Sequence, residues 1–453
     1  MPIPSRSAAA PVRGRLLRLL GVGFGLAVTV GSMLGVGILR TPALVAAQVP
    51  STGGVLTVWV FGGLYSVLAA ICLTELGTML PNAGGYYAYA RRAFGDTVGY
   101  AVGWTDWICY GAVLGYVSIG MGEFVGVLVP GLAWATKPIA LGTVALFAAL
   151  QLGGVRLSAW FQQATTAVKF AAFLVLVVAC LVYAASGGAP APAAAAVASP
   201  GLAGVVYAVQ AVVITYGGFQ SALYFAEEDH DPARNLPRSL IGGVSAVLLV
   251  YVLVNVALLA VLPVATLAGS TLAAADAAQL VFGGRGGQFI TLLSIVSLPP
   301  LLNAILMIGA RILYALGRDG LLWAGTAQVG ASGTPGLATV LTTVVAAVLI
   351  ATGTFQTLIA VASVYLAANC FVTCVALMVL RRREPALQRP FRAWGYPASA
   401  IVVIVASGAF LAGTVAGDPR TAATAAGLLA LGFLVRPLAA RLSPVPVASA
   451  LDA

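Results

Sequence analysis

The sequence predicts an all-α polytopic membrane protein with twelve transmembrane helices, in which a five-plus-five inverted repeat contains two broken helices. Three observations predict this fold class. Of the 453 residues, 60% are hydrophobic and only 8% are charged, whereas an ordinary soluble domain carries about 25% charged residues. The apolar residues also form runs of about 20 or more, the length that crosses a bilayer as a helix. Finally, one such run in each half of the chain is interrupted by glycines.

The apolar runs divide the chain into two blocks of similar length. The expected spans cover residues 19–46, 54–80, 98–128, 133–154, 161–184, 203–226, 239–262, 286–315, 335–353, 356–380, 398–416 and 421–440. Five spans lie in 19–184 and five in 203–380, with an external loop (185–202) between the blocks and two accessory helices (398–440) after them. An odd number of spans forces the second block to insert upside down relative to the first, which makes an inverted-topology repeat.

Basic residues indicate the orientation of the chain in the membrane. On one side of the twelve-span arrangement lie Arg6, Arg13, Arg15, Arg18, Arg91, Arg92, Arg156, Arg234, Arg238, Arg318, Arg381, Arg382, Arg383, Arg389, Arg392 and Arg441. The opposite loops contain only Lys137, Arg285 and Arg420. The positive-inside rule therefore predicts a multi-pass protein of the cell membrane whose tails, 1–18 and 441–453, are both cytoplasmic.

Composition also argues against several other classes of protein. The net charge of +10 follows from the topology and favours anionic lipid headgroups. No basic face with interleaved aromatic residues suggests a nucleic-acid partner. With five cysteines in apolar spans and a single histidine, we expect neither a disulfide framework nor a metal site. No cofactor is expected.

The glycine interruptions are the strongest indication of function. They lie at residues 31–37 (GSMLGVG) and 216–219 (YGGF). A helix that gives up its backbone hydrogen bonds in lipid needs other partners for those groups. A matched pair of broken helices in the two halves of a chain is typical of the substrate site of a secondary transporter. Alternatively, Gly31 and Gly35 only allow close helix packing, since they have the spacing of a small-xxx-small motif.

Several motifs, in order along the chain, resemble the amino acid–polyamine–organocation transporters. They are residues 31–39 (GSMLGVGIL) with Thr41 and Pro42, 74–77 (TELG), 81–86 (PNAGGY), 216–219 (YGGF) with Glu227 and Glu228, 231–237 (DPARNLP), 311–320 (RILYALGRDG) and 391–397 (FRAWGYP). Together they span roughly residues 20–400. The resemblance implies a ten-helix inverted-repeat core and transport of amino acids by alternating access.

A free amino acid needs donors for its carboxylate and acceptors for its ammonium group. Exposed N–H groups at the start of a half-helix suit the carboxylate, and carbonyl groups released by the same break suit the ammonium. The expected site therefore comprises Met33, Leu34, Gly35, Val36, Gly37, Tyr216, Gly217, Gly218 and Phe219. Among these, Tyr216 resembles the aromatic gate of the family, and Phe219 is a candidate for the side-chain pocket.

Lys169, one of two lysines, is the first candidate for coupling transport to an ion. An ionisable group inside a span costs about 2.5–3.5 kcal/mol and is functional by default, although its amine can instead reach the membrane interface. In the sodium-independent transporters that this chain resembles, a lysine on the fifth helix stands where sodium-coupled relatives hold an ion. The family often has a hydroxyl just before the position of Asn303, where this chain has residues 299–302 (PPLL). The nearest hydroxyls upstream are Ser294 and Ser297, and Ser297 is the candidate partner of Lys169.

Three acidic or charged regions need separate interpretations. Asp106, inside the third span, either carries a proton, contacts a cationic substrate or makes structural hydrogen bonds. We expect Glu75 to form a structural ion pair. The charged segments 227–238 and 311–319 either form an inner gate through salt bridges or are solvated loops. His230, within the first of these segments, is expected to be exposed.

Taken together, these features favour a sodium-independent transporter of neutral amino acids that is coupled to protons. An amino-acid exchanger and a cationic amino acid or polyamine carrier are the alternatives, and a substrate-sensing receptor is the alternative outside transport. An enzyme is not expected, because one histidine in a charged loop provides no catalytic constellation. The expected partners are a free amino acid, a proton and the lipid bilayer. No accessory glycoprotein is expected, since no cysteine lies in an external loop, and the chain is expected to be a monomer or homodimer.

Overall fold

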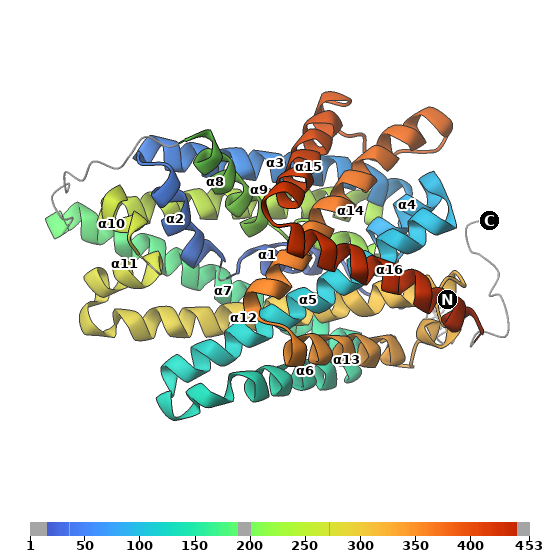
Figure 1. Ribbon diagram of the computed structural model, residues 1–453, viewed down its shortest axis with the longest axis horizontal. Helices are drawn as coiled ribbons and strands as arrows, with labels where there is room; N and C mark the ends of the chain where they lie inside the picture. Colours follow the sequence, from blue (N-terminus) through green and yellow to red (C-terminus); the bar gives the residue numbers. More distant parts are fainter. Residues whose placement is uncertain (1–15, 36, 189–200, 271, 442–453) are drawn as a thin grey trace, which may run out of the picture.

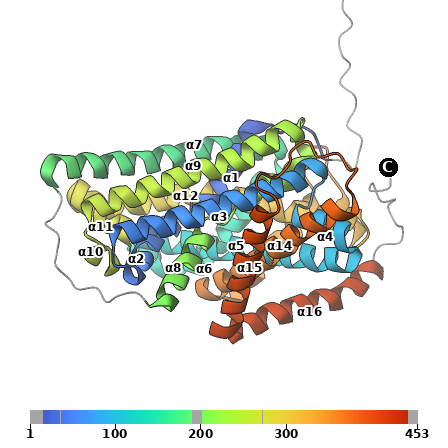
Figure 2. The ribbon, with the colours of Figure 1, turned by 90° about the horizontal axis from the view of Figure 1, so that it is seen from above.

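The computed structural model describes residues 16–35, 37–188, 201–270 and 272–441, and these residues are helical throughout apart from turns and one isolated bridge. The long helices run roughly along the longest axis of the molecule (Figure 1). α15 and α16 lie at the edge of this bundle (Figure 2), where both pack on α14. The all-α class is therefore confirmed for the described residues.

The chain forms a succession of long helices joined by short turns and short helices. In chain order these are α1 (Val22–Met33), α2 (Gly37–Gln48), α3 (Thr52–Met79), α4 (Tyr86–Phe94), α5 (Asp96–Leu128), η1 (Pro130–Ala135), α6 (Thr136–Leu152), α7 (Val155–Tyr183), η2 (Ala184–Gly188), α8 (Leu202–Thr215), η3 (Ser221–Glu228), α9 (Pro232–Val261), α10 (Val264–Ala268), α11 (Ala273–Phe282), η4 (Gly283–Arg285), α12 (Gly286–Arg318), η5 (Ala324–Ala327), α13 (Gly336–Thr352), α14 (Phe355–Arg383), α15 (Ala398–Gly417) and α16 (Pro419–Arg441).

Most of these helices are suited to a bilayer. Within the described residues, 9 helical segments are long and apolar enough to cross a membrane, and α1 with α2 adds a further one if the bent pair forms a single span. Two shorter apolar helices, Gly204–Thr215 and Gly336–Thr352, lie where the sixth and ninth spans are expected. The chain is therefore a polytopic membrane protein by composition and length. The count of twelve spans and the inverted repeat remain predictions.

Two expected spans are interrupted at their glycines. α1 ends at Met33 and α2 begins at Gly37, with the two axes bent by 45°. The expected span 203–226 divides into α8, which ends at Thr215, and the 3-10 helix η3. The helix that contains the expected span 239–262 is longer than that span, because α9 already starts at Pro232. Proline fits the first helical position, where its missing N–H has no intrahelical partner to lose.

The halves of the two broken helices pack in a crossed pairing. α1 packs against η3, α7, α9 and α12, whereas α2 packs against α8, α10 and α11. The first half of one broken helix is thus beside the second half of the other. α4 and the C-terminal end of α16 lie at one end of the molecule, and α10 and α11 lie at the other (Figure 1).

Candidate substrate and coupling site

The first break separates two glycines with different surroundings. A Cβ atom on Gly31 would lie 2.6 Å from both Gln162 Nε2 and Thr166 Oγ1, so Gly31 is needed for close packing against α7. A Cβ on Gly35 would meet nothing nearer than Leu301 Cδ2 at 3.8 Å. Packing therefore explains Gly31 and does not explain Gly35, which lies after the end of α1 where the backbone is accessible. Val36 lies outside the described residues.

The second break contacts the first directly. Gly218 has φ +104°, a backbone conformation that favours glycine. A Cβ there would lie 2.9 Å from the carbonyl carbon and oxygen of Ser32, so the absence of a side chain permits the two breaks to meet. A Cβ on Gly217 would lie 3.2 Å from Leu366 Cδ2. The two breaks predicted from glycine patterns are therefore brought together in space.

One half of each broken helix, α2 and α8, is joined to the other by side chains as well. Thr41 Oγ1 of α2 and Thr215 Oγ1 of α8 are 2.8 Å apart and share a hydrogen bond. Gly37, the first residue of α2, faces the same threonine, because its Cβ would lie 3.0 Å from Thr215 Cγ2. Gly37 thus starts the second half-helix at a position where a side chain would crowd α8.

Tyr251 of α9 is a central residue that the sequence analysis missed. Its hydroxyl donates to the Met33 carbonyl at 2.5 Å and lies 3.2 Å from the Thr215 carbonyl. Met33 is the last residue of α1 and Thr215 is the last residue of α8. Its ring packs on Tyr216, with centroids 4.9 Å apart, and on Trp59 at 5.6 Å. One phenol O–H therefore lies within hydrogen-bond distance of a carbonyl at each break, with the shorter bond to Met33. The only signal in the sequence is a tyrosine inside an apolar run.

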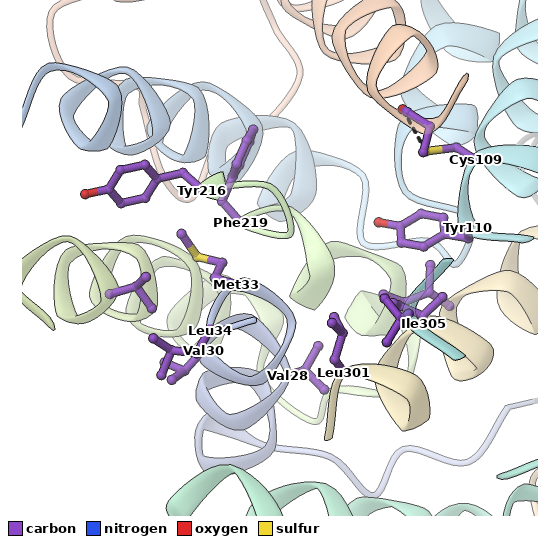
Figure 3. Close-up of a cluster of buried hydrophobic side chains, with 14 of the residues drawn as sticks. Val28, Val30, Met33, Leu34, Cys109, Tyr110, Tyr216, Phe219, Leu301 and Ile305 are labelled. Atoms are coloured by element: carbon purple, nitrogen blue, oxygen red, sulfur yellow. Dashed lines mark hydrogen bonds between the residues drawn. The ribbon is translucent and has the colours of Figure 1, made fainter. Parts of the chain in front are cut away.

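The side chains around the breaks are mainly apolar. Met33, Tyr216 and Phe219 lie near one another (Figure 3), and Tyr216 and Phe219 are 0% and 3% exposed. Tyr216 donates through its hydroxyl to the Trp59 carbonyl at 3.2 Å. The residues drawn across from them are Leu301, Ile305 and Tyr110. Leu34 follows α1 and is also fully buried.

Lys169 lies on α7 with its whole side chain buried. Its Nζ donates to the Gly31 carbonyl at 2.9 Å, so the amine is held at the C-terminal part of α1 and does not reach the membrane interface. Ser297 donates to the Leu293 carbonyl of its own helix at 2.6 Å. Among the described residues, the hydrogen-bond partner of Lys169 is thus a carbonyl, and Ser297 has no bond to it.

Two further polar residues of α7, both missed in the sequence analysis, bind α1 one turn before Gly31. Gln162 Nε2 and Thr166 Oγ1 donate to the Ala27 carbonyl at 3.2 and 3.0 Å. Residues 162, 166 and 169 share one face of a helix. This face presents three donors to carbonyls one turn apart on α1. A polar residue every turn within an apolar span is the signal that would have found them.

Asp106 of α5 is 1% exposed. Its Oδ2 accepts a hydrogen bond from the Tyr224 hydroxyl at 2.7 Å, and its Oδ1 accepts a longer one from Asn369 Nδ2 at 3.4 Å. Thr105 Oγ1 in turn donates to Asn369 Oδ1 at 3.0 Å. Asp106 is therefore held by hydrogen bonds from two other elements, η3 and α14.

The charged segments 227–238 and 311–319 are connected by ion pairs, as one of the two interpretations predicts. Arg311 contacts Glu228 through two nitrogens at 2.7 and 2.8 Å, and both side chains are almost completely buried. Arg318 contacts Glu227 at 2.6 Å. The Leu20 N–H, just before α1, donates to the Glu228 carbonyl at 3.0 Å. These bonds tie the start of α1, η3 and the end of α12 together.

A second set of ion pairs extends this cluster to α4. Arg91 contacts Asp319 at 2.8 Å and Asp96 at 2.7 Å. The Tyr87 hydroxyl donates to Asp319 at 2.8 Å. Burial, together with the charge of Asp319, raises the pKa of the Tyr87 phenol well above its usual value. Tyr87 therefore remains a donor to Asp319 at physiological pH. His230 is exposed, as expected.

The expected ion pair at Glu75 is confirmed. Glu75 is fully buried, and its carboxylate contacts both Arg381 and Arg389. The Ala393 N–H donates to it at 2.7 Å. Within the described part of the chain, no group of three or more His, Cys, Asp or Glu residues is arranged to hold a metal ion.

Comparisons with known proteins agree with the motifs of this site. A family model described as "Amino acid permease" matches residues 25–435. The b(0,+)-type amino acid transporter 1 of Mus musculus is 26% identical, covering 83% of this chain and 79% of the relative. The serine/threonine exchanger SteT of Bacillus subtilis is 27% identical, covering 66% and 68%. The methylthioribose transporter of the same bacterium is 26% identical, covering 89% and 87%. The chain therefore belongs to the amino acid permease family, within the amino acid–polyamine–organocation superfamily that its motifs resemble.

Proposed function

We propose that this protein is a sodium-independent carrier of neutral amino acids that works by alternating access and takes up a proton with its substrate. The observation that carries the proposal is the meeting of the two breaks, at Gly218 and Ser32, in a chain of the amino acid permease family. Backbone groups of Met33, Leu34, Gly35, Val36 and Gly37 on one side, and of Tyr216, Gly217 and Gly218 on the other, form the substrate site. Phe219 contributes to the pocket for the side chain.

Lys169 supports sodium independence. Sodium is a hard cation and needs several oxygen ligands. The Gly31 carbonyl already accepts a bond from the Lys169 amine at 2.9 Å. When it is protonated, that amine also opposes a second cation nearby, and the opposition is stronger in a buried environment than in water.

The apolar surroundings support a neutral substrate. Met33, Phe219, Leu301 and Ile305 are buried hydrophobic residues on the two sides of the breaks. Asp106, the buried carboxylate in this part of α5, is engaged by Tyr224 and Asn369. A substrate with a cationic side chain would need an anionic partner in this low-dielectric environment, and a neutral one would not.

Exchange of amino acids is the second candidate mode. It is favoured by one observation, the similarity to a relative named as a serine/threonine exchanger. In either mode we propose that the chain works without an accessory glycoprotein, as a monomer or homodimer. All five cysteines are buried in the described structure, so none of them offers an external attachment point.

Purified protein in liposomes tests these proposals. Uptake of labelled amino acids, with methylthioribose as a further substrate, would be measured into empty vesicles under an inward proton gradient and into preloaded vesicles without a gradient. Uptake into empty vesicles that a protonophore abolishes supports proton symport, whereas uptake restricted to preloaded vesicles supports exchange. Uptake that requires sodium would contradict the role given to Lys169. If neither set of vesicles takes up an amino acid, the proposed substrate class is wrong.

Two lysine variants complete the experiment. Lys169→Ala removes the donor from the Gly31 carbonyl, and we expect it to abolish uptake. Lys137→Ala is the matched control, because Lys137 lies at the surface and donates to the Ala351 carbonyl. Equal uptake by both variants would show that Lys169 is not needed at the break.

A further inference from the structure

We infer that Asp106 is the residue that binds the transported proton and that Tyr224 transmits its protonation state to the cytoplasmic ion pairs. The inference rests on the proposed proton symport and assigns the proton to one carboxylate. It gives the proton-binding role to Asp106 and not to Lys169. The bond of Lys169 to the Gly31 carbonyl persists in both protonation states, because a neutral amine is still a donor.

Asp106 is buried without a cationic partner. Asp106 is 1% exposed, and among the described residues no lysine, arginine or histidine forms an ion pair with it. An ionised carboxylate in such a place is costly. Two donors, Tyr224 and Asn369, offset part of that cost when the group is ionised. The carboxylate is thus held where both forms are accessible within a transport cycle.

The groups that surround Asp106 are neutral. The titratable side chains near it are Tyr86 of α4, Cys109 and Tyr110 of α5, and Tyr224 of η3, which are three phenols and a thiol. Asn369 of α14 provides the amide donor. The acidic residues of η3, Glu227 and Glu228, are already paired with Arg318 and Arg311. Asp106 is therefore the acidic group of this cluster that lacks a cationic partner.

A short chain of side chains links Asp106 to the second break. Gln220, which follows Phe219 directly, donates through Nε2 to the Tyr110 hydroxyl at 3.0 Å. The Tyr110 ring packs edge-on against Tyr224, with centroids 5.4 Å apart. Gln220 Oε1 is buried and has no hydrogen-bond partner among the described residues. A substrate at the break therefore lies next to an open acceptor that belongs to the same network as Asp106.

Tyr224 connects the Asp106 carboxylate to the element that carries the ion-paired glutamates. It lies on η3, the element that carries Glu227 and Glu228 and that packs against α1. An ionised Asp106 accepts the Tyr224 hydroxyl and holds η3 to α5. When a proton from the outer solution binds a carboxylate oxygen, the carboxyl group becomes a donor and a weaker acceptor, so this hold loosens. Release of the same proton on the cytoplasmic side restores it.

Asp106→Asn is the main variant, tested in the same liposomes. It keeps the shape of the side chain and removes the titration. We expect accumulation driven by the proton gradient to be lost, while exchange into preloaded vesicles continues at a rate that no longer varies with pH. Asp418→Asn is the matched control, since Asp418 lies outside the spanning helices and caps α16 through Thr421. It should behave like the wild type.

Tyr224→Phe is the second variant, and it keeps the carboxylate. The phenol donates to Asp106, which favours the ionised form, so its loss should shift the pH midpoint of uptake to a higher value. Tyr207→Phe, at an exposed tyrosine, should leave the midpoint in place. If Asp106→Asn does not give a monodisperse protein, an unchanged pH midpoint in Tyr224→Phe overturns the inference.

The remaining outcomes are distinguishable. Gradient-driven accumulation that persists in Asp106→Asn overturns the assignment and leaves the proposed transport intact. A loss of uptake confined to cationic amino acids also overturns it, because Asp106 would then be a substrate contact. A wild type that exchanges amino acids and ignores the gradient contradicts the proposed symport itself.

Discussion

Tyr251 shows how a single residue supports both breaks. A broken helix leaves its last carbonyl groups without intrahelical donors, and in lipid no water replaces them. The Tyr251 hydroxyl lies 2.5 Å from the Met33 carbonyl and 3.2 Å from the Thr215 carbonyl. It therefore ties the ends of α1 and α8 together.

Replacing Tyr251 with phenylalanine tests this role. The variant keeps the ring contacts with Tyr216 and Trp59 and removes the donor, which costs about 1–3 kcal/mol when it leaves a buried acceptor unsatisfied. We expect a lower melting temperature of the purified protein and reduced uptake. Tyr207→Phe is the control, because Tyr207 is 51% exposed. A melting temperature equal to that of the control would contradict a supporting role for the hydroxyl.

At the scale of elements, the contact between the breaks depends on Gly218. Gly218→Ala requires an alanine at φ +104° and places a methyl group 2.9 Å from the Ser32 carbonyl. The backbone conformation alone costs roughly 1–2 kcal/mol, and the clash adds to it. We expect the yield of folded protein and the uptake rate to fall.

Gly417→Ala is the corresponding control, because nothing lies within 4 Å of a Cβ at that residue. Both variants would be compared by size-exclusion chromatography and uptake. Wild-type behaviour of Gly218→Ala would show that the turn after α8 and the end of α1 can move apart without loss, and that their close contact is not needed.

The Arg311–Glu228 pair joins α12 to η3. Removing one partner leaves the other charge buried, at a cost of about 3–5 kcal/mol. We therefore expect Arg311→Met or Glu228→Gln to lower the melting temperature strongly, and Arg311→Met combined with Glu228→Met to recover part of the loss. Arg234→Met, at a side chain that is 78% exposed, should change little. Additive losses in the double variant would show that the two residues do not act as a pair.

The sequence was sufficient for some elements and not for others. The breaks after Met33 and after Thr215 were predictable, because glycine clusters interrupt long apolar runs. The ion pairs between segments 227–238 and 311–319 were also anticipated. The roles of Tyr251 and Gln162 were not, since a lone polar residue in a span does not reveal which carbonyl it meets. Those partners are set by packing between helices distant in sequence.

For the whole molecule, the distribution of charge predicts how the chain is oriented. The end that includes α4 carries the ion pairs of Arg91, Arg311 and Arg318, and the predicted topology puts most of the arginines of the chain on the same side of the membrane. The positive-inside rule assigns this end to the cytoplasm. Because all five cysteines are buried in the described structure, a cysteine introduced at the surface gives a selective probe of that orientation.

Gly131→Cys and Ala386→Cys place this probe on opposite sides of the predicted topology. Gly131 is exposed between α5 and α6, in a predicted external loop, and Ala386 is exposed after α14, in the arginine-rich segment. A membrane-impermeant maleimide should label Gly131→Cys on intact cells and label Ala386→Cys only after permeabilisation. The reverse pattern would show that the chain is inserted with the opposite orientation, and the ion pairs of Arg311 and Arg318 would then face the exterior. Labelling of both variants on intact cells would contradict the predicted span count, because an even number of spans would separate the two loops.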